Sequence, residues 1–182
     1  ECWNIGIRKS RGKYITNANL DDRRSPLHLE VLVNYLENNP QISAVSSALV
    51  VTYQPNEDWY FFTPEAIWFN ELSGEISFDD LYAYQNEIVV SRNTLHCMPL
   101  WRKNLHDKYG YFDEISYGTS ADWEFWLRCS SQGEKYGIVG LPLGLYYINP
   151  NSHNRRNDTN GSLELNIIKK YFLSDQEKVL KQ

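Results

Sequence analysis

The chain has 182 residues, with 18 Lys and Arg against 23 Asp and Glu, and therefore a formal net charge of −5. This length and a hydrophobic share of 42% are typical of one domain with a single sizeable core, and they exclude a disordered chain. The basic residues are scattered among more numerous acids, so the chain lacks the basic face that nucleic acid or an anionic membrane requires.

Three cysteines, Cys2, Cys97 and Cys129, form an odd set with no Cys-x-x-Cys spacing. This pattern argues against a disulfide framework and a structural zinc site, and it favours a reducing compartment. The sequence also contains no apolar run of membrane-spanning length and does not open with a signal segment. We therefore expect a soluble, cytoplasmic protein.

The first half of the chain predicts helices and strands in alternation. Helix-like composition over residues 3–11 ends at Gly12, which suits the left-handed position beyond a helix end. Strands are predicted over residues 13–18 and 42–53. Between them Ser25-Pro26 opens a helix that Pro40 stops. This order is that of an α/β fold.

The second half contains a long aromatic-rich segment and then further regular elements. Residues 54–81 show no clean period, and excursions of this length in compact domains are commonly substrate-facing. Beyond them we predict a strand over residues 87–90, helices over 100–109 and 122–132, strands over 136–139 and 143–148, a polar loop over 149–161 and a terminal helical segment over 163–182. Residues 1–182 are expected to form one domain.

An acidic pair, Asp21-Asp22, follows the first predicted strand at its carboxyl end. In open α/β sheets ligands bind at this edge. Hard cations such as Mg²⁺ or Mn²⁺ take carboxylate oxygens there and share their other positions with water and substrate phosphates. The alternative is that both residues are turn residues whose charge suits the N-terminus of the next helix.

Two further side chains are candidates for chemistry. Asp122 lies in the first turn of an aromatic-faced helix and could act as a general base, although it or Ser120 could equally be the helix N-cap. His153 lies in a loop with Arg155 and Arg156, where imidazole and guanidinium groups could meet a metal–diphosphate. A lone loop histidine is more often simply solvated.

Taken in order, five segments resemble the family 2 glycosyltransferases of GT-A fold. They are an Asn-x-Gly … Gly-x-Tyr-Ile lead-in from Asn4 to Ile15, the Asn19-Leu20-Asp21-Asp22 metal motif, the helix of residues 26–36, Gly110-Tyr111-Phe112-Asp113-Glu114, and the base-carrying block Ala121-Asp122-Trp123-Glu124-Phe125-Trp126-Leu127-Arg128. Each motif is weak alone, but the ordered series is specific.

The resemblance implies an α/β, partial GT-A mixed sheet flanked by helices. It also implies metal-dependent, inverting transfer of a sugar from a nucleotide-sugar donor to a hydroxyl of a glycan or lipid-linked acceptor. Family members often work at the inner face of a membrane, so the resemblance also implies that this protein is peripheral to that face. It assigns the donor to Asn19, Asp21 and Asp22, the Mn²⁺ or Mg²⁺ ion to Asp21 and His153, the catalytic base to Asp122 and an acceptor contact to Trp123.

The chain departs from the family pattern at three points. Asn19 stands where the first acid of the metal motif is usual, and Ala121 replaces the Glu before the base, so the partner of the base is changed. Two parts of the family pattern have no counterpart ahead of Asn4. They are the first strand and the acidic strand end that binds the nucleobase of the donor. We therefore expect the carboxyl-terminal part of a GT-A domain, with the nucleotide-binding half absent from this sequence or supplied by a partner.

Two other functions remain open at this point. A non-catalytic glycan-binding or scaffold module is favoured by Asn19, Ala121 and the aromatic residues 59–69. Metal-dependent nucleotidyl or phosphoryl transfer would share Asp21-Asp22 but leaves the Asp122 block unexplained.

Overall fold

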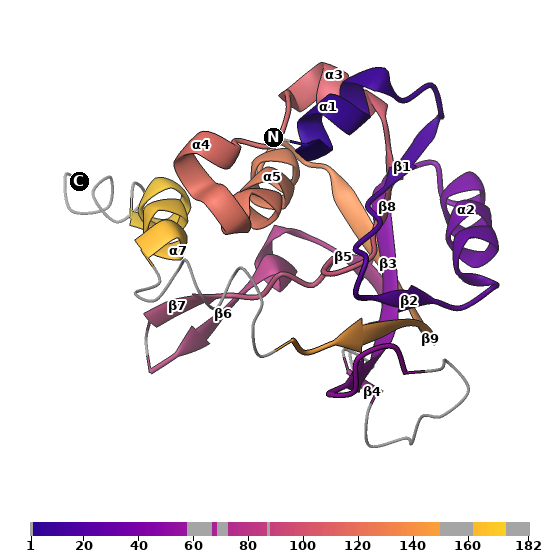
Figure 1. The fold of residues 1–182 in the computed structure, drawn as a ribbon. Helices are drawn as coiled ribbons and strands as arrows, with labels where there is room; N and C mark the ends of the chain where they lie inside the picture. The colour runs from indigo at the N-terminus through magenta and orange to yellow at the C-terminus, as the bar shows by residue number, and fades with distance from the viewer. Residues whose placement is uncertain (1, 58–66, 69–72, 87, 150–161, 174–182) are drawn as a thin grey trace.

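The computed structural model describes residues 2–57, 67–68, 73–86, 88–149 and 162–173 (Figure 1). A mixed sheet forms its centre, and the main path of this sheet runs in the order β1-β8-β3-β9-β2. These strands are β1 Tyr14–Thr16, β8 Leu100–Arg102, β3 Ile42–Thr52, β9 Lys135–Tyr147 and β2 Arg23–Arg24. β3 and β9 are parallel, and the other neighbours on the path are antiparallel.

Short strands extend the sheet at its margins. β4 (Ile67–Trp68) pairs with β3, and β5 (Gly74–Ile76) pairs with β9. A 3₁₀ turn, η2 (Phe78–Leu81), then leads into a separate hairpin of β6 (Tyr82–Gln85) and β7 (Ile88–Ser91). The central strand β3 is buried at every residue but one, as expected of a strand covered on both faces.

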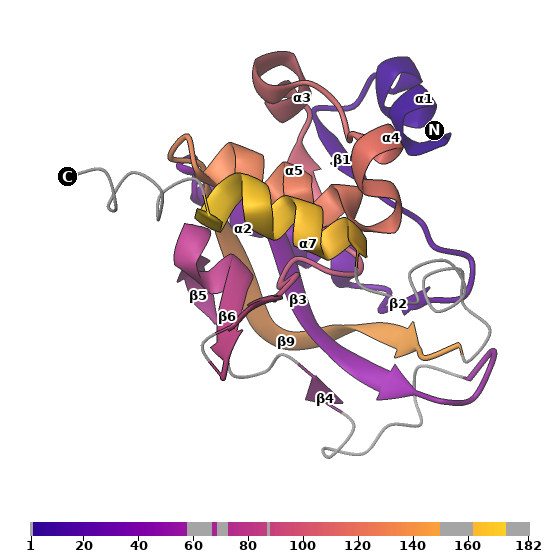
Figure 2. The same ribbon diagram turned by 90° about the vertical axis from the view of Figure 1, so that its left-hand side faces the viewer.

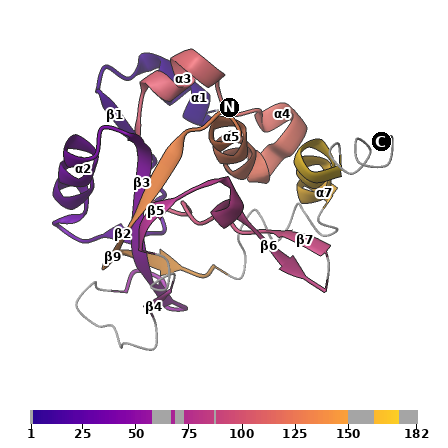
Figure 3. The same cartoon turned by 180° about the vertical axis from the view of Figure 1, so that it is seen from behind.

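Helices cover both faces of the sheet. α2 (His28–Asn38) lies on one face, and α5 (Ala121–Ser130) lies on the other together with the remaining helices (Figures 1 and 3). These are α1 (Cys2–Lys9), α3 (Asn104–Tyr109), α4 (Glu114–Tyr117) and α7 (Ser162–Ile168), which continues into the π-helical turn η4 (Lys169–Leu173). A short 3₁₀ turn, η3 (Gly118–Ser120), joins α4 to α5.

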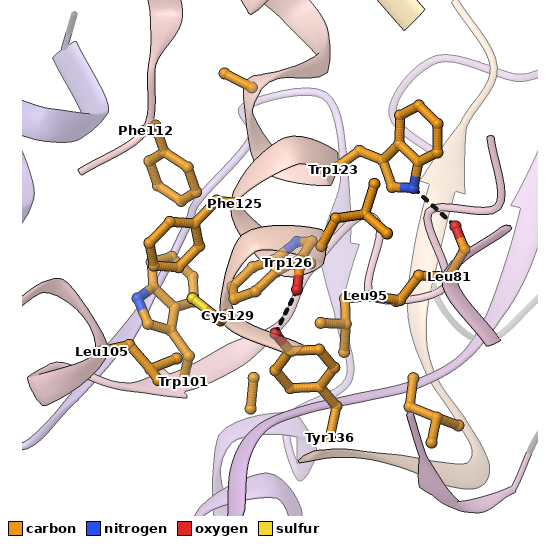
Figure 4. Packing of buried hydrophobic residues seen from close by; sticks show 14 of the residues in the cluster. Leu81, Leu95, Trp101, Leu105, Phe112, Trp123, Phe125, Trp126, Cys129 and Tyr136 are labelled. Atoms are coloured by element: carbon orange, nitrogen blue, oxygen red, sulfur yellow. Dashed lines mark hydrogen bonds between the residues drawn. The ribbon is translucent and has the colours of Figure 1, made fainter. Parts of the chain in front are cut away.

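An aromatic cluster fills the space between α5 and the sheet (Figure 4). The indole N–H of Trp123 donates to the carbonyl of Leu81 at 2.7 Å, and the hydroxyl of Tyr136 donates to the carbonyl of Trp126 at 2.7 Å. The polar atoms of these large side chains are thus satisfied inside the core, which makes their burial favourable.

The other face of the sheet is closed by α2. Its Leu32 and Leu36 are fully buried against Val45 and neighbouring strand residues. The helix approaches β9 so closely that a Cβ on Gly137 would lie 2.4 Å from the ring of Tyr35. A larger residue at position 137 would therefore displace the Tyr35 side chain.

The α/β fold class is confirmed, and three of the predicted elements are wrong in part. The helix predicted over residues 3–11 ends at Lys9, and Gly12 does not adopt a positive φ. The predicted helix over residues 100–109 begins only at Asn104, because Leu100–Arg102 is β8 and bridges β1 and β3. The two strands predicted over 136–139 and 143–148 are one strand, β9. Its register against β3 shifts within residues 140–143 of β9. Pro142 has no N–H for the ladder, and this interruption resembles a strand end in the sequence.

Some of the predicted segments fall outside the described residues. These are most of 54–72, the polar loop from residue 150 to 161 with His153, and residues 174–182 of the terminal segment. Among the described helices, none has the length and apolar character needed to cross a membrane.

Candidate active site

A cleft of about 730 Å³ opens beside the N-terminal end of α5. The loop after β1 contributes Asn17 and Asn19 to its wall, and the segment at the end of β7 contributes Asn93 and His96. Residues of α1, of α7 and of the turn that precedes α5 complete the wall, and Asp122 lies in it. The fold thus brings Asn19 and Asp122, which are far apart in the sequence, to one cavity.

The Asp122 carboxylate is held at both oxygens. Its Oδ1 accepts the backbone N–H of Trp123 at 2.8 Å, as a residue at the start of a helix can. Its Oδ2 accepts a hydrogen bond from Nδ2 of Asn93 at 2.8 Å. Each oxygen keeps a further lone pair, and the half-buried side chain lines the cleft, so Asp122 is placed as a general base would be.

The turn that presents Asp122 is built from local signals. The Asp113 carboxylate caps α4 by accepting the N–H of Ser116 at 3.0 Å, and this backbone hydrogen bond lowers the pKa of Asp113. Gly118 follows with φ +48°, a left-handed conformation that favours glycine. A Cβ at this position would also lie 3.0 Å from the side chain of Leu163 in α7.

Trp123 has a different role from the one predicted. Its side chain is only 1% exposed, and its N–H is committed to the carbonyl of Leu81. A side chain buried in this way has no free face on which a sugar could stack, so we assign Trp123 to the supporting wall of the cleft. The exposed aromatic surface there is Trp3 of α1, which is 38% exposed and packs edge-on against Phe112.

The Asp21-Asp22 pair consists of one exposed and one buried carboxylate. Asp22 is 8% exposed, and its Oδ1 accepts the N–H of Tyr147 at 3.1 Å. Its Oδ2 accepts a hydrogen bond from Nδ2 of Asn19 at 2.9 Å. Asp22 therefore holds the loop after β1 to the end of β9, whereas Asp21 is open to solvent.

Arg24 in β2 secures the same loop from the other side. Its guanidinium donates to Oγ1 of Thr16 at 3.0 Å and to the carbonyl of Asn17. Burial lowers the pKa of Arg24, and the nearby Cys97 and Asp22 oppose that shift. Burial and the charge of Asp22 raise the pKa of the Cys97 thiol well above its usual value, which favours the protonated thiol.

The chemistry of these side chains fits an ion that is shared with substrate. No group of three or more His, Cys, Asp or Glu capable of holding a metal ion occurs within the described residues. Mg²⁺ is commonly bound through one or two carboxylates and the substrate's phosphates, and the exposed Asp21 suits that arrangement. His153, the second predicted ligand, lies outside the described residues.

A buried carboxylate fixes the wall of the cleft that α7 provides. Glu124 of α5 is 1% exposed, and its Oε1 accepts hydrogen bonds from Lys170 at 2.6 Å and from the hydroxyl of Tyr171 at 2.7 Å. Its Oε2 accepts one from Arg128 at 3.0 Å. These bonds join η4, the continuation of α7, to α5, and Figure 2 shows α7 lying alongside α5.

The Asn-x-Gly lead-in has a structural explanation. Asn4 is 9% exposed, and its Nδ2 donates to the carbonyl of Phe112 at 2.8 Å. Its Oδ1 accepts the N–H of the same residue at 3.1 Å. The paired bonds dock α1 onto the Gly-x-Phe-Asp-Glu segment, so two of the motifs that carry the resemblance contact each other.

Sequence reasoning missed Asn93 and Trp3. Neither residue lies in a sequence motif that indicates its role. Asn93, for example, belongs to the unpatterned stretch Ser91-Arg92-Asn93-Thr94. Only the folding of the β7 end against α5 brings Asn93 to Asp122.

The described architecture is that of a GT-A glycosyltransferase. A crystal structure of S. aureus TarS residues 1–349 in complex with UDP matches it with a TM-score of 0.56 at 14% identity, over 81% of this chain and 39% of the TarS chain. A second structure of TarS 1–349 gives a TM-score of 0.55 at 10% identity, over 94% of this chain and 51% of that one. At these identities the likeness establishes the fold.

The chain belongs to glycosyl transferase family 2, whose family model matches residues 2–107. It is 27% identical over 151 residues to an uncharacterized glycosyltransferase of Methanocaldococcus jannaschii, which covers 83% of this chain and 47% of that protein. It is 26% identical over 132 residues to an uncharacterized glycosyltransferase of Haemophilus influenzae, which covers 71% and 39%. The chain spans less than half the length of these curated relatives. The family match contains Asn19, Asp21 and Asp22 but ends before Asp122.

Proposed function

We propose that this chain carries the catalytic base and the diphosphate side of an inverting, metal-dependent glycosyltransferase that transfers a sugar from a nucleotide-sugar donor to a hydroxyl of a glycan or lipid-linked acceptor. The observation that carries this proposal is the shared cleft, in which Asn19 of the donor loop and Asp122 at the start of α5 both line the wall. Membership of family 2 supports glycosyl transfer in general.

In the proposed reaction, Asp122 removes the proton from the acceptor hydroxyl as the hydroxyl oxygen attacks the anomeric carbon of the donor sugar. The new bond forms on the face opposite the leaving group, so the configuration inverts. The bond from the anomeric carbon to the diphosphate breaks, and the nucleoside diphosphate departs with that electron pair.

The loop after β1 holds the donor in this scheme. Asp21 would hold a Mn²⁺ or Mg²⁺ ion, which when bound neutralises charge on the leaving diphosphate. Asn19 would contact the donor, while Asp22 and Arg24 keep the loop in place from beneath. Asp22 is only 8% exposed, so in this scheme it supports the loop through its hydrogen bonds to Asn19 and Tyr147 and does not contact the donor directly.

The first test is calorimetric titration of this chain with UDP and with GDP, each with and without Mn²⁺. UDP is an informed choice because TarS, which shares the fold, has been crystallised with it. Binding that needs Mn²⁺ and disappears in Asp21→Ala would support the donor half of the proposal. Glycan binding that depends on neither nucleotide nor metal would instead favour a non-catalytic glycan-binding module.

The second test is turnover by the product of the complete reading frame, with a panel of UDP- and GDP-sugars and glycoside acceptors. Release of the nucleoside diphosphate together with a new glycosidic bond of inverted configuration is expected. A product that retains the donor configuration would overturn the assignment of Asp122 as the base of a single displacement.

A further inference from the structure

The partner of Asp122 is the feature that the family pattern does not explain. Ala121 provides only a methyl group where a Glu is usual, so the neighbouring residue in the sequence cannot orient the Asp122 carboxylate. The structure shows a hydrogen bond of 2.8 Å from Nδ2 of Asn93 to Oδ2 of Asp122 instead. Asn93 follows β7, so this contact comes from a different part of the fold.

The orientation of the Asn93 amide is fixed by chemistry. An ionised carboxylate can only accept hydrogen bonds, so the NH₂ group of Asn93 must face Asp122 and its Oδ1 must face the other way. That Oδ1 is buried, and no hydrogen-bond donor meets it among the residues that the structure describes.

This arrangement is unfavourable for folding. A buried carbonyl oxygen without a donor lowers the stability of the fold, and an apolar side chain of similar size would avoid that loss. An unsatisfied polar group in a native structure requires an explanation, and the explanation available here is the bond that the other end of the amide makes to Asp122.

We propose that Asn93 is the positioning residue of the catalytic base: its amide fixes the Asp122 carboxylate in the cleft and takes the place of the missing partner at position 121. This inference rests on the proposed function, in which Asp122 is the base. Asp122 is then held by two bonds from separate elements, its own helix through Trp123 N–H and the β7 end through Asn93. With both oxygens engaged, rotation of the carboxylate about its terminal bond is restricted.

The experiment compares Asn93→Leu with the wild type in the product of the complete reading frame. We expect kcat to fall about a hundredfold, the usual penalty for a misplaced reacting group, while the affinity for UDP with Mn²⁺ is unchanged. The melting temperature should equal or exceed that of the wild type, because the unsatisfied Oδ1 is removed. Asn104→Leu, at an exposed position in α3 away from the cleft, is the matched control and should retain full turnover.

A double-mutant cycle separates positioning from a structural role. If Asn93 acts through Asp122, Asn93→Leu should lower the residual turnover of Asp122→Asn by less than twofold. A hundredfold loss in both backgrounds, or a loss accompanied by a lower melting temperature, would overturn the inference. Retained kcat in Asn93→Leu would also overturn it.

A readout without substrate completes the test. The side-chain amide signals of Asn93, assigned by their loss in Asn93→Leu, should move in the NMR spectrum of Asp122→Asn and stay in place in Asp113→Asn. Unmoved signals in Asp122→Asn would overturn the inference even if turnover is normal. If the signals move in Asp122→Asn but the wild-type protein transfers no sugar, the contact exists and the proposed function is wrong. The catalytic role of Asn93 would then be overturned as well.

Discussion

The loop after β1 and the start of α5 each contain two acids, and within each pair the fold uses the two carboxylates differently. In the loop after β1, the buried Asp22 holds the backbone in place, and its neighbour Asp21 is left open to solvent. At the start of α5 the order is the same, because the half-buried Asp122 lines the cleft and the buried Glu124 two residues later holds the helices together. Each motif therefore pairs a buried carboxylate that holds the structure together with a more accessible one, to which we assign the proposed chemistry.

Neighbouring acids in a motif therefore need not share a function. Burial separates them, since a buried carboxylate is stable only when the protein supplies donors to its oxygens. A carboxylate buried in that way is also closed off from a metal or a substrate. The following predictions test the division between the two kinds of acid.

The largest expected effect is on catalysis by Asp122→Asn. Loss of a general base lowers kcat by about a thousandfold, and the nearly isosteric amide should leave the affinity for UDP with Mn²⁺ within twofold of the wild type. Turnover numbers and calorimetry on the same preparation measure both quantities. A kcat within tenfold of the wild type would remove Asp122 from the role of base.

The next effect is on stability in Glu124→Leu. The substitution removes the acceptor of three hydrogen bonds and leaves Arg128 and Lys170 without their anion, so the free energy of unfolding should fall by about 3 kcal/mol in urea denaturation. The control is Glu37→Gln, because the Lys13–Glu37 ion pair is exposed and screened by water and should matter far less. Equal losses in the two variants would show that Glu124 does not fix α7.

Substitution of the two acids after β1 should have opposite effects on nucleotide binding and on stability. Asp21→Asn should weaken Mn²⁺-dependent binding of UDP at least about tenfold and leave the unfolding free energy unchanged. Asp22→Asn should cost about 1–3 kcal/mol of stability, because one bond to Tyr147 or Asn19 is lost and an NH₂ group faces a donor. If Asp22→Asn is fully stable but binds no metal–nucleotide, the two roles are exchanged.

The smallest expected effect concerns His28, which is fully buried in α2. Burial, with a contribution from the charge of Arg24, lowers the pKa of His28 from its ordinary 6.5 to about 4. The unfolded chain therefore takes up a proton that the folded chain refuses as the pH falls from 6.5 towards 4. Stability should be complete above pH 6.5 and should decrease below it, by about 1 kcal/mol for the first pH unit.

The measurement for His28 is urea denaturation at pH 7.0 and pH 5.5 for the wild type and His28→Leu. The difference in unfolding free energy between the two proteins should shift in favour of His28→Leu at the lower pH. An unchanged difference would mean that His28 takes up a proton equally in the folded and unfolded states.

The sequence by itself determined the alternation of elements and the family. The apolar spacing of α2 and the small and β-branched residues of β3 are local signals, and this helix and this strand form where those signals lie. The expectation for Gly12 is wrong, since α1 ends at Lys9 and Gly12 does not adopt a positive φ. The ordered motifs from Asn4 to Asp122 likewise depend on residue type and spacing, which a single sequence displays.

Only the tertiary structure decided which side chains meet. Leu100–Arg102 is a strand because β1 and β3 lie on either side of it. Trp123 is buried in the core, where the carbonyl of Leu81 accepts its indole N–H. The pairing of Asn93 with Asp122 and the separation of Asp21 from Asp22 arise in the same way, from contacts between distant segments. Hydrogen bonding and burial are set by neighbours in space, and a linear pattern does not contain that information.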